Sequence, residues 1–205
     1  LEYPAGSPTA VAFITGRVNS TTYYVQSQTG GTPTAAGAGT AVNIYRCYNS
    51  LDNWEDNLLG EENDSINAAV DDYIAYSALN LVTDNFIAMA ACYADGEDSA
   101  GTYIDGWTTG ANNYIKIYTP TETTEVGATQ RHDGTWGSGY QRTTSLLIYD
   151  EYVRIDGLSI KHGNDAAGSL YFVLNNPGTG EIHISHCFGH LTSATSGYDG
   201  YEIEI

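Results

Sequence analysis

The sequence is poor in positive charge. It has seven Lys and Arg residues against 25 Asp and Glu residues among its 205 residues, which gives a formal net charge of −18. Binding to a nucleic-acid backbone needs clustered Lys and Arg side chains, and an anionic membrane surface attracts the same clusters. The charge balance therefore argues against nucleic acid and membrane as partners.

Long apolar runs and paired cysteines are scarce as well. No apolar run approaches the ~20 residues of a membrane-spanning helix. The three cysteines, Cys47, Cys92 and Cys187, include no Cys-x-x-Cys pair, which disfavours a structural zinc site. One interpretation is a disulfide between Cys47 and Cys92 in an extracytoplasmic protein. The other is three buried thiols that pack as small apolar groups.

Short alternating strands are what the sequence does contain. Val153 and Ile155 alternate with Arg154 and Asp156, and Gly157 follows them. This pattern predicts a strand with one buried face and then a sharp turn. Similar apolar pairs recur at Ile115/Ile117, Ile182/Ile184 and Ile203/Ile205. Aligned by these pairs, the four strands are expected to pair in parallel and to stack their apolar side chains.

Three motifs carry a family resemblance. Residues 155–160 read Ile-Asp-Gly-Leu-Ser-Ile, residues 184–189 read Ile-Ser-His-Cys-Phe-Gly, and residues 23–25 read Tyr-Tyr-Val before a Gly-rich loop. In these motifs the chain resembles right-handed parallel β-helix proteins of the pectate-lyase-like type, found among secreted carbohydrate-active proteins and phage tail or surface proteins. The resemblance implies an all-β fold, a right-handed parallel β-helix (solenoid), and an extracellular, cell-surface or virion location.

The chain divides into an arm and a domain in this interpretation. Residues 1–20 are expected to form an extended N-terminal arm, and residues 21–205 the parallel β-helix domain. The last strand, 201–205, is expected to continue or to dock on a partner beyond residue 205. Ser50 is a good N-cap for a short amphipathic helix, which would cover the first coil as an N-terminal helical cap with Trp54 as its plug.

One outward face gathers the scarce positive charge. In the expected register, Lys116, Arg154 and His183 form one column, and Asp156 lies in the next. The functional interpretation is a strip that binds an acidic polysaccharide, with Arg154, Asp156 and His183 as candidate catalytic residues, because β-helix lyases use an Arg or Lys to take a proton beside a uronate. The alternative, which we favour, is a ladder of charged pairs on an exposed strand. His186 is expected to fill a turn position rather than to bind metal.

Two loops carry the remaining candidates. Trp136 and Tyr140 lie in the Gly-rich loop 119–145, where their rings either present flat faces for sugar stacking or fold back and pin the loop. With Lys116 and Arg154 they are the predicted binding residues. The turn with Asp95, Glu97 and Asp98 is the best calcium candidate, and a solvated turn is its alternative. Calcium is the one cofactor that the sequence suggests.

The sequence contains no complete catalytic motif, so we expect a structural or adhesive role rather than an enzyme. The predicted function is a rigid extracellular or virion surface protein that contacts glycans or other copies of itself, as a homo-oligomer or filament. The alternative function is a polysaccharide lyase or hydrolase that acts on an acidic glycan.

Overall fold

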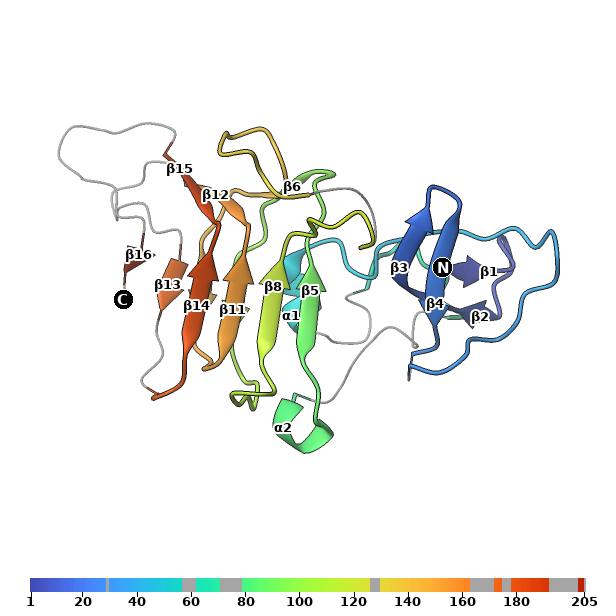
Figure 1. The fold of residues 1–205 in the computed structure, drawn as a ribbon, viewed down its shortest axis with the longest axis horizontal. Helices are drawn as coiled ribbons and strands as arrows, with labels where there is room; N and C mark the ends of the chain where they lie inside the picture. The colour runs from blue at the N-terminus through green and yellow to red at the C-terminus, as the bar shows by residue number, and fades with distance from the viewer. Residues whose placement is uncertain are drawn as a thin grey trace. The chain divides into compact units, whose positions relative to one another are not determined.

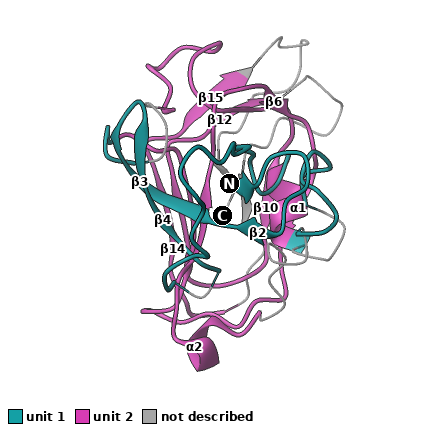
Figure 2. Ribbon diagram, turned by 90° about the vertical axis from the view of Figure 1, so that its right-hand side faces the viewer, with its two compact units in different colours: residues 1–49, 56–77, 122–128 teal, residues 50–55, 78–121, 129–205 magenta. Residues whose placement is uncertain are grey.

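The computed structural model describes residues 1–28, 30–56, 62–70, 79–125, 130–162, 172–174, 178–191 and 203–204. The chain forms two compact units, drawn in teal and magenta in Figure 2. Unit 1 comprises residues 1–49, 56–77 and 122–128, and unit 2 comprises residues 50–55, 78–121 and 129–205.

Unit 2 contains three parallel sheets of four strands each, and each sheet takes every third strand of the chain. The first has the order β14-β11-β8-β5, and its strands lie side by side with their arrows in one direction in Figure 1. These strands are Ile182–Ser185 (β14), Val153–Asp156 (β11), Ile115–Tyr118 (β8) and Ala88–Ala91 (β5). The second has the order β15-β12-β9-β6, with Phe188–Leu191, Ser159–His162, Gln141–Arg142 and Glu97–Asp98. The third has the order β16-β13-β10-β7, with Ile203–Glu204, Phe172–Leu174, Leu146–Ile148 and Thr102–Ile104.

The core of unit 2 is built from the alternation that the sequence shows. In β8 and β11, Ile115, Ile117, Val153 and Ile155 are at most 1% exposed, while the residues between them are half-buried. The third sheet buries Ile104, Leu146 and Ile148 by the same alternation, whereas in β12 both Ser159 and Ile160 are buried. Since side chains alternate between the two faces of a strand, each strand sends its branched apolar residues to one side.

The predicted register is confirmed for three of the four strands. Val153 lies opposite Ile115 and Ile182, and Ile155 lies opposite Ile117 and Ile184. The fourth placement is wrong, because Ile203 in β16 pairs with Phe172 of β13 in a different sheet. An apolar pair predicts a strand but does not specify which neighbour the strand pairs with.

Unit 1 contains antiparallel pairs. Glu2–Tyr3 (β1) pairs with Ala10–Val11 (β2), and Phe13–Asn19 (β3) forms a hairpin with Thr22–Gln26 (β4). The register of the hairpin shifts twice, between Ile14 and Gly16 and between Arg17 and Asn19. The buried Glu2 carboxylate accepts hydrogen bonds from Asn43 Nδ2 at 2.9 Å and from the Asn67 backbone N–H at 3.0 Å.

The described residues contain two short helices. Helix α1 spans Leu51–Asp56, and Ser50 Oγ accepts a hydrogen bond from the Asn53 N–H at 3.1 Å, as the predicted N-cap requires. The Trp54 ring stacks on Trp107 with 5.8 Å between centroids. The rest of the predicted helix, 57–60, lies outside the described residues. Helix α2, Leu81–Asp84, is capped by Asn80 and was not predicted. No described helix is long and apolar enough to cross a lipid bilayer.

The predicted fold class, an all-β right-handed parallel β-helix with an N-terminal helical cap, is wrong. The described residues form five small sheets of short strands, some parallel and some antiparallel, with two short helices. The predicted β-helix domain begins at residue 21, but the strand at 22–26 pairs antiparallel with the strand just before it, because the tight turn after Asn19 reverses the chain. The described part of the expected cap helix, Leu51–Asp56, forms helix α1.

Candidate functional site

Three positively charged or protonatable side chains align across the outward face of the first sheet. The register pairs Arg154 of β11 with Lys116 of β8 on one side and with His183 of β14 on the other. We call these three residues the basic column. On β5 the column continues with the exposed Met89. The basic column therefore spans three neighbouring strands, which lie ~4.8 Å apart in a sheet.

Two members of the basic column lie over aromatic rings. Lys116 Nζ is 4.1 Å from the centroid of the Tyr118 ring, and Arg154 Cζ is 3.6 Å from the centroid of the Tyr114 ring. Among the described residues, no carboxylate forms an ion pair with Lys116 or Arg154. A cation over a ring face keeps N–H donors for a ligand, so both side chains are oriented and still able to bind an anion.

His183 is held differently. Its Nε2 is 3.0 Å from Glu181 Oε2, and the two side chains are 59% and 70% exposed. Exposed ion pairs contribute little, about 0–1 kcal/mol. An anionic ligand can therefore displace Glu181 at small cost.

Asp156 lies beside the basic column and is surrounded by hydrogen-bond donors. Its Oδ1 accepts from Ser185 Oγ at 2.8 Å and contacts His186 Nδ1 at 2.6 Å, and its Oδ2 pairs with Arg131 Nη2. Partial burial opposes ionisation of Asp156, but the hydrogen bonds from His186, Ser185 and Arg131 outweigh it and lower the pKa of this carboxyl. Asp156 is therefore an anion at neutral pH and is unsuited to donate a proton.

The turn after β14 places His186 against Asp156. His186 has φ 49°, in the left-handed region, and the register puts it opposite Gly157, which has φ 87°. This confirms the prediction that His186 fills a turn position. Because Nδ1 faces a carboxylate, it carries the proton, and Nε2 is left as the acceptor nitrogen. The ring is 66% exposed, so Nε2 can meet a ligand.

The two aromatic residues of the Gly-rich loop occupy different environments. Trp136 stacks on His190 with 5.5 Å between centroids and an interplanar angle of 15°, and Lys161 Nζ lies 5.2 Å from its ring centroid. Tyr140 is buried, and its hydroxyl donates to Asp98 Oδ2 at 2.6 Å. Burial raises the pKa of Tyr140 well above its usual value. Of the two, only Trp136 has a ring within reach of a ligand.

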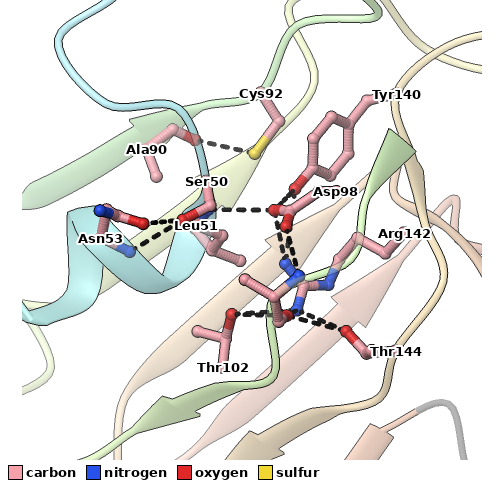
Figure 3. A network of polar contacts seen from close by, with 11 residues as sticks. Ser50, Leu51, Asn53, Ala90, Cys92, Asp98, Thr102, Tyr140, Arg142 and Thr144 are labelled. Carbon is pink, nitrogen blue, oxygen red and sulfur yellow. Dashed lines mark hydrogen bonds and ion pairs between the residues drawn. The ribbon is translucent and has the colours of Figure 1, made fainter. Parts of the chain in front are cut away.

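The acidic turn does not gather its carboxylates. Asp95 and Glu97 are exposed, whereas Asp98 points inward and forms a 2.8 Å ion pair with Arg142, which is fully buried (Figure 3). The same Asp98 oxygen accepts the backbone N–H of Leu51 at 3.0 Å. In the described part of the chain no three His, Cys, Asp or Glu side chains are placed to hold a metal ion. The calcium candidates Asp95, Glu97 and Asp98 are thus not brought together.

Sequence reasoning missed Arg131, Arg142 and His186 as partners of the predicted carboxylates. The one signal in the sequence was the composition: with 25 Asp and Glu residues against seven Lys and Arg residues, an arginine has many candidate carboxylate partners. The three cysteines all lie among the described residues, and no disulfide joins any two of them.

Comparisons of the chain with protein-family models, with curated proteins and with solved structures found no match. The functional argument therefore rests on the geometry of the site.

Proposed function

We propose that this protein is an extracellular or virion surface protein with a structural or adhesive role, and that it binds an acidic glycan through the basic column. The observation that carries the proposal is the alignment of Lys116, Arg154 and His183 across three adjacent strands. The chain has a net charge of −18, so most of its surface repels anions. The basic column is a place on this surface where an anion is attracted.

The geometry suits a linear anionic polymer. Parallel strands place successive side chains of the column ~4.8 Å apart, and a polysaccharide with one carboxylate per sugar presents charges at a comparable repeat. Arg154 offers a planar fork of donors that matches a carboxylate, and Lys116 offers a point charge. Tyr114 and Tyr118 fix the two cations before the ligand arrives, which reduces the entropy lost on binding.

The test is binding of polygalacturonate and alginate, with neutral dextran as the reference polymer, by affinity electrophoresis and calorimetry. We expect binding of an acidic polymer that weakens as salt rises, and loss of at least tenfold in affinity in the double variant Lys116→Ala/Arg154→Ala. Arg17→Ala removes a cation from unit 1 and is the matched control. Equal binding by the double variant and the wild type would refute the proposal.

Assembly is the second part of the proposed role. We expect the chain to form a homo-oligomer or a filament in its native setting, since structural and adhesive surface proteins act as repeated copies. Mass photometry of the protein across a range of salt concentrations tests this point. A single monomeric mass at every salt and protein concentration contradicts it.

The lyase remains the second candidate function, because one observation favours it. The His186 imidazole is held by an ionised carboxylate, and Arg131 in turn holds that carboxylate. Such an orienting pair suits a general base. In this candidate, His186 Nε2 takes the proton from the carbon beside a uronate carboxyl. The C–H electrons form a double bond, and the neighbouring glycosidic oxygen leaves and takes a proton from water.

Ultraviolet absorbance of unsaturated products separates the two functions. If the lyase function is present, His186→Asn abolishes turnover and keeps binding, since Asn tolerates the left-handed turn and still donates to Asp156. Arg17→Ala, the control for binding, is expected to leave turnover unchanged. If the protein binds the polymer but forms no unsaturated product, the result supports the adhesive function and refutes the lyase.

A further inference from the structure

The third sheet of unit 2 has an outward face of its own. In β7, Thr102 and Ile104 are buried, and Tyr103 between them is 53% exposed. Leu147 of β10 lies beside Tyr103 in register. The alternation continues past each strand, so the exposed Asp105 follows Ile104 and the half-buried Tyr149 follows Ile148. We call Tyr103, Leu147, Tyr149 and Asp105 the tyrosine patch.

The two rings of the tyrosine patch pack against each other at the surface. Their centroids are 6.2 Å apart and their planes differ by 27°. Neighbouring strands lie ~4.8 Å apart, and residues i and i+2 of one strand lie roughly 7 Å apart. The patch therefore has about the dimensions of a single sugar ring.

Three other aromatic side chains in the described part of the chain are held by a hydrogen bond. Trp107 Nε1 donates to the buried Glu55 at 2.9 Å, the Tyr140 hydroxyl donates to Asp98, and the Tyr3 hydroxyl donates to the Thr34 carbonyl at 2.6 Å. Within the described ranges, no hydrogen bond holds the hydroxyl of Tyr103 or Tyr149. The rings and hydroxyls of the tyrosine patch are thus available to a ligand.

The charge beside the patch selects the ligand. The Asp105 backbone N–H donates to Glu55 Oε1 at 3.0 Å, and the Asp105 side chain is exposed at the end of the patch, near Asp150. Carboxylates repel an anionic ligand and accept hydrogen bonds from hydroxyls. An apolar platform with an acceptor at its edge fits the C–H face and the hydroxyls of a neutral sugar.

A second copy of the chain is a poorer occupant. Contact between two copies through this face would bring Asp105 and Asp150 of one copy close to the same carboxylates of the other, and like charges repel each other. A neutral ligand carries no such penalty.

We propose that the tyrosine patch is a binding site for a neutral sugar residue, in which Tyr103 and Tyr149 stack on the ring and Asp105 accepts hydrogen bonds from its hydroxyls. The site lies on a different sheet from the basic column and prefers ligands of different charge, so it does not depend on the proposed binding of acidic glycans.

The experiment titrates the full chain with four neutral oligosaccharides, cellohexaose, mannohexaose, xylohexaose and chitohexaose, followed by saturation-transfer NMR and tyrosine fluorescence. We expect saturable binding of at least one of them in the micromolar to millimolar range. Tyr103→Ala lowers that affinity about tenfold or more, because it removes the stacking ring. Tyr103→Phe keeps the ring and most of the affinity, and Asp105→Asn weakens binding severalfold.

Two controls separate this site from the rest of the molecule. Tyr24→Ala removes a tyrosine that is 66% exposed in unit 1 and leaves sugar binding unchanged. Binding of polygalacturonate to Tyr103→Ala equals that of the wild type if the two sites are independent. The proposal is overturned if none of the four oligosaccharides saturates, if Tyr103→Ala binds them as the wild type does, or if sedimentation shows a dimer that Tyr103→Ala abolishes.

Discussion

At the scale of single residues, Asp98 and Arg142 form a buried ion pair in unit 2. Arg142 also donates to the Ala100 carbonyl at 2.8 Å and to Thr102 Oγ1 at 3.0 Å, so β6, β9 and β7 meet at one guanidinium (Figure 3). Truncating one partner of such a pair leaves the other charge buried and unpaired, which costs about 3–5 kcal/mol.

We expect Asp98→Ala to lower the free energy of unfolding by about 3–5 kcal/mol. The substitution leaves the buried Arg142 guanidinium without its carboxylate partner, and it removes the acceptor of the Tyr140 hydroxyl and of the Leu51 N–H. Chemical denaturation measures the change. Glu97→Ala, at the exposed neighbouring position of β6, is the control and is expected to change stability by less than ~0.5 kcal/mol. A loss below 1 kcal/mol for Asp98→Ala would mean that the pair contributes little.

Asp98 also shows why a prediction from neighbouring residues in the sequence can fail. Asp98 lies among acidic neighbours in the sequence, which suggested a calcium turn. Its partner Arg142 is 44 positions further along the chain, and no local pattern connects the two. The sequence did predict Arg154 and Lys116 side by side, because both lie in strands with a clear apolar alternation.

Gly157 provides a second residue-scale prediction. It has φ 87°, and a Cβ at this position would lie 3.1 Å from Arg131 Cζ and would also collide with Thr119 Oγ1 and Arg131 Nε. Gly106 has a similar φ of 90° with no atom within 4 Å of the added Cβ. Gly106→Ala thus carries only the left-handed backbone cost of about 1–2 kcal/mol. Gly157→Ala carries that cost and the crowding of about 1–3 kcal/mol.

Thermal and chemical unfolding of Gly106→Ala and Gly157→Ala measures the two losses of stability, and their difference is the cost of crowding the added Cβ against Arg131 and Thr119. We also expect Gly157→Ala to displace Arg131 and so to weaken its pair with Asp156. Equal losses of stability in the two variants would show that Arg131 and Thr119 move aside without cost.

Asp150 gives the pH-dependent prediction. Burial raises its pKa from the ordinary 3.8 to about 6, with repulsion from Asp105 adding to the rise and hydrogen bonds from the Trp107 and Gly106 N–H groups opposing it. Between pH 3.8 and about 6 the native state holds more protons on this group than the unfolded state. The contribution of Asp150 to the free energy of unfolding therefore falls as pH rises through that window.

Carboxyl ¹³C NMR checks the titration of Asp150 directly. We expect a midpoint near 6 in the wild type and a lower midpoint in Asp105→Asn, which removes the repulsion. Asp64→Asn, at an exposed position in unit 1, is expected to leave the midpoint unchanged. A wild-type midpoint near the ordinary value of about 4 is the contrary result.

At the scale of elements, strand order predicts local stability. Strands β8 and β11 have a parallel partner on both sides, whereas β5 and β14 are the outer strands of the same described sheet. In unit 1 the hairpin of β3 and β4 forms a sheet of two strands only. Two-stranded hairpins are marginally stable by themselves, so opening is easier there.

Native-state hydrogen exchange tests this order. We expect the slowest amides in Ile115–Tyr118 and Val153–Asp156, faster exchange in the outer strands, and the fastest among these elements in the hairpin. Lys116 and Arg154, whose side chains point outward in β8 and β11, serve as internal controls. Their amides are expected to exchange as slowly as those of the buried neighbours, because protection follows the pairing of the backbone and not the burial of the side chain. Equal protection in β5 and β8 would contradict the assignment of inner and outer strands.

Element length decides which elements the sequence predicts. Strands β8, β11 and β14 have four residues each and two apolar inward positions, so their alternation is visible. Strand β6 has two residues and helix α2 has four, which is too short for any periodicity to appear. The hairpin was missed for another reason: Thr22–Gln26 has strand-forming residues, but its partner is set by the turn before it and not by its own pattern.

At the scale of the whole molecule, net charge is the dominant property. With −18 charges on 205 residues, the folded chain repels itself, and salt screens that repulsion. The screening length falls from ~30 Å at 0.01 M to ~8 Å at 0.15 M ionic strength. We expect the unfolding temperature to rise between these two concentrations of NaCl.

Calcium at the same ionic strength separates general screening from a specific site. Because Asp98 is committed to Arg142, and Asp95 and Glu97 remain on the exposed surface, we expect CaCl₂ and MgCl₂ to raise the unfolding temperature equally at matched ionic strength. Calcium accepts more ligands and more irregular geometry than magnesium, so a true calcium site would favour CaCl₂ alone. A rise specific to calcium that Asp95→Asn or Glu97→Gln removes would place a calcium site at this turn. An equal rise with both salts would identify the acidic surface itself as the cause.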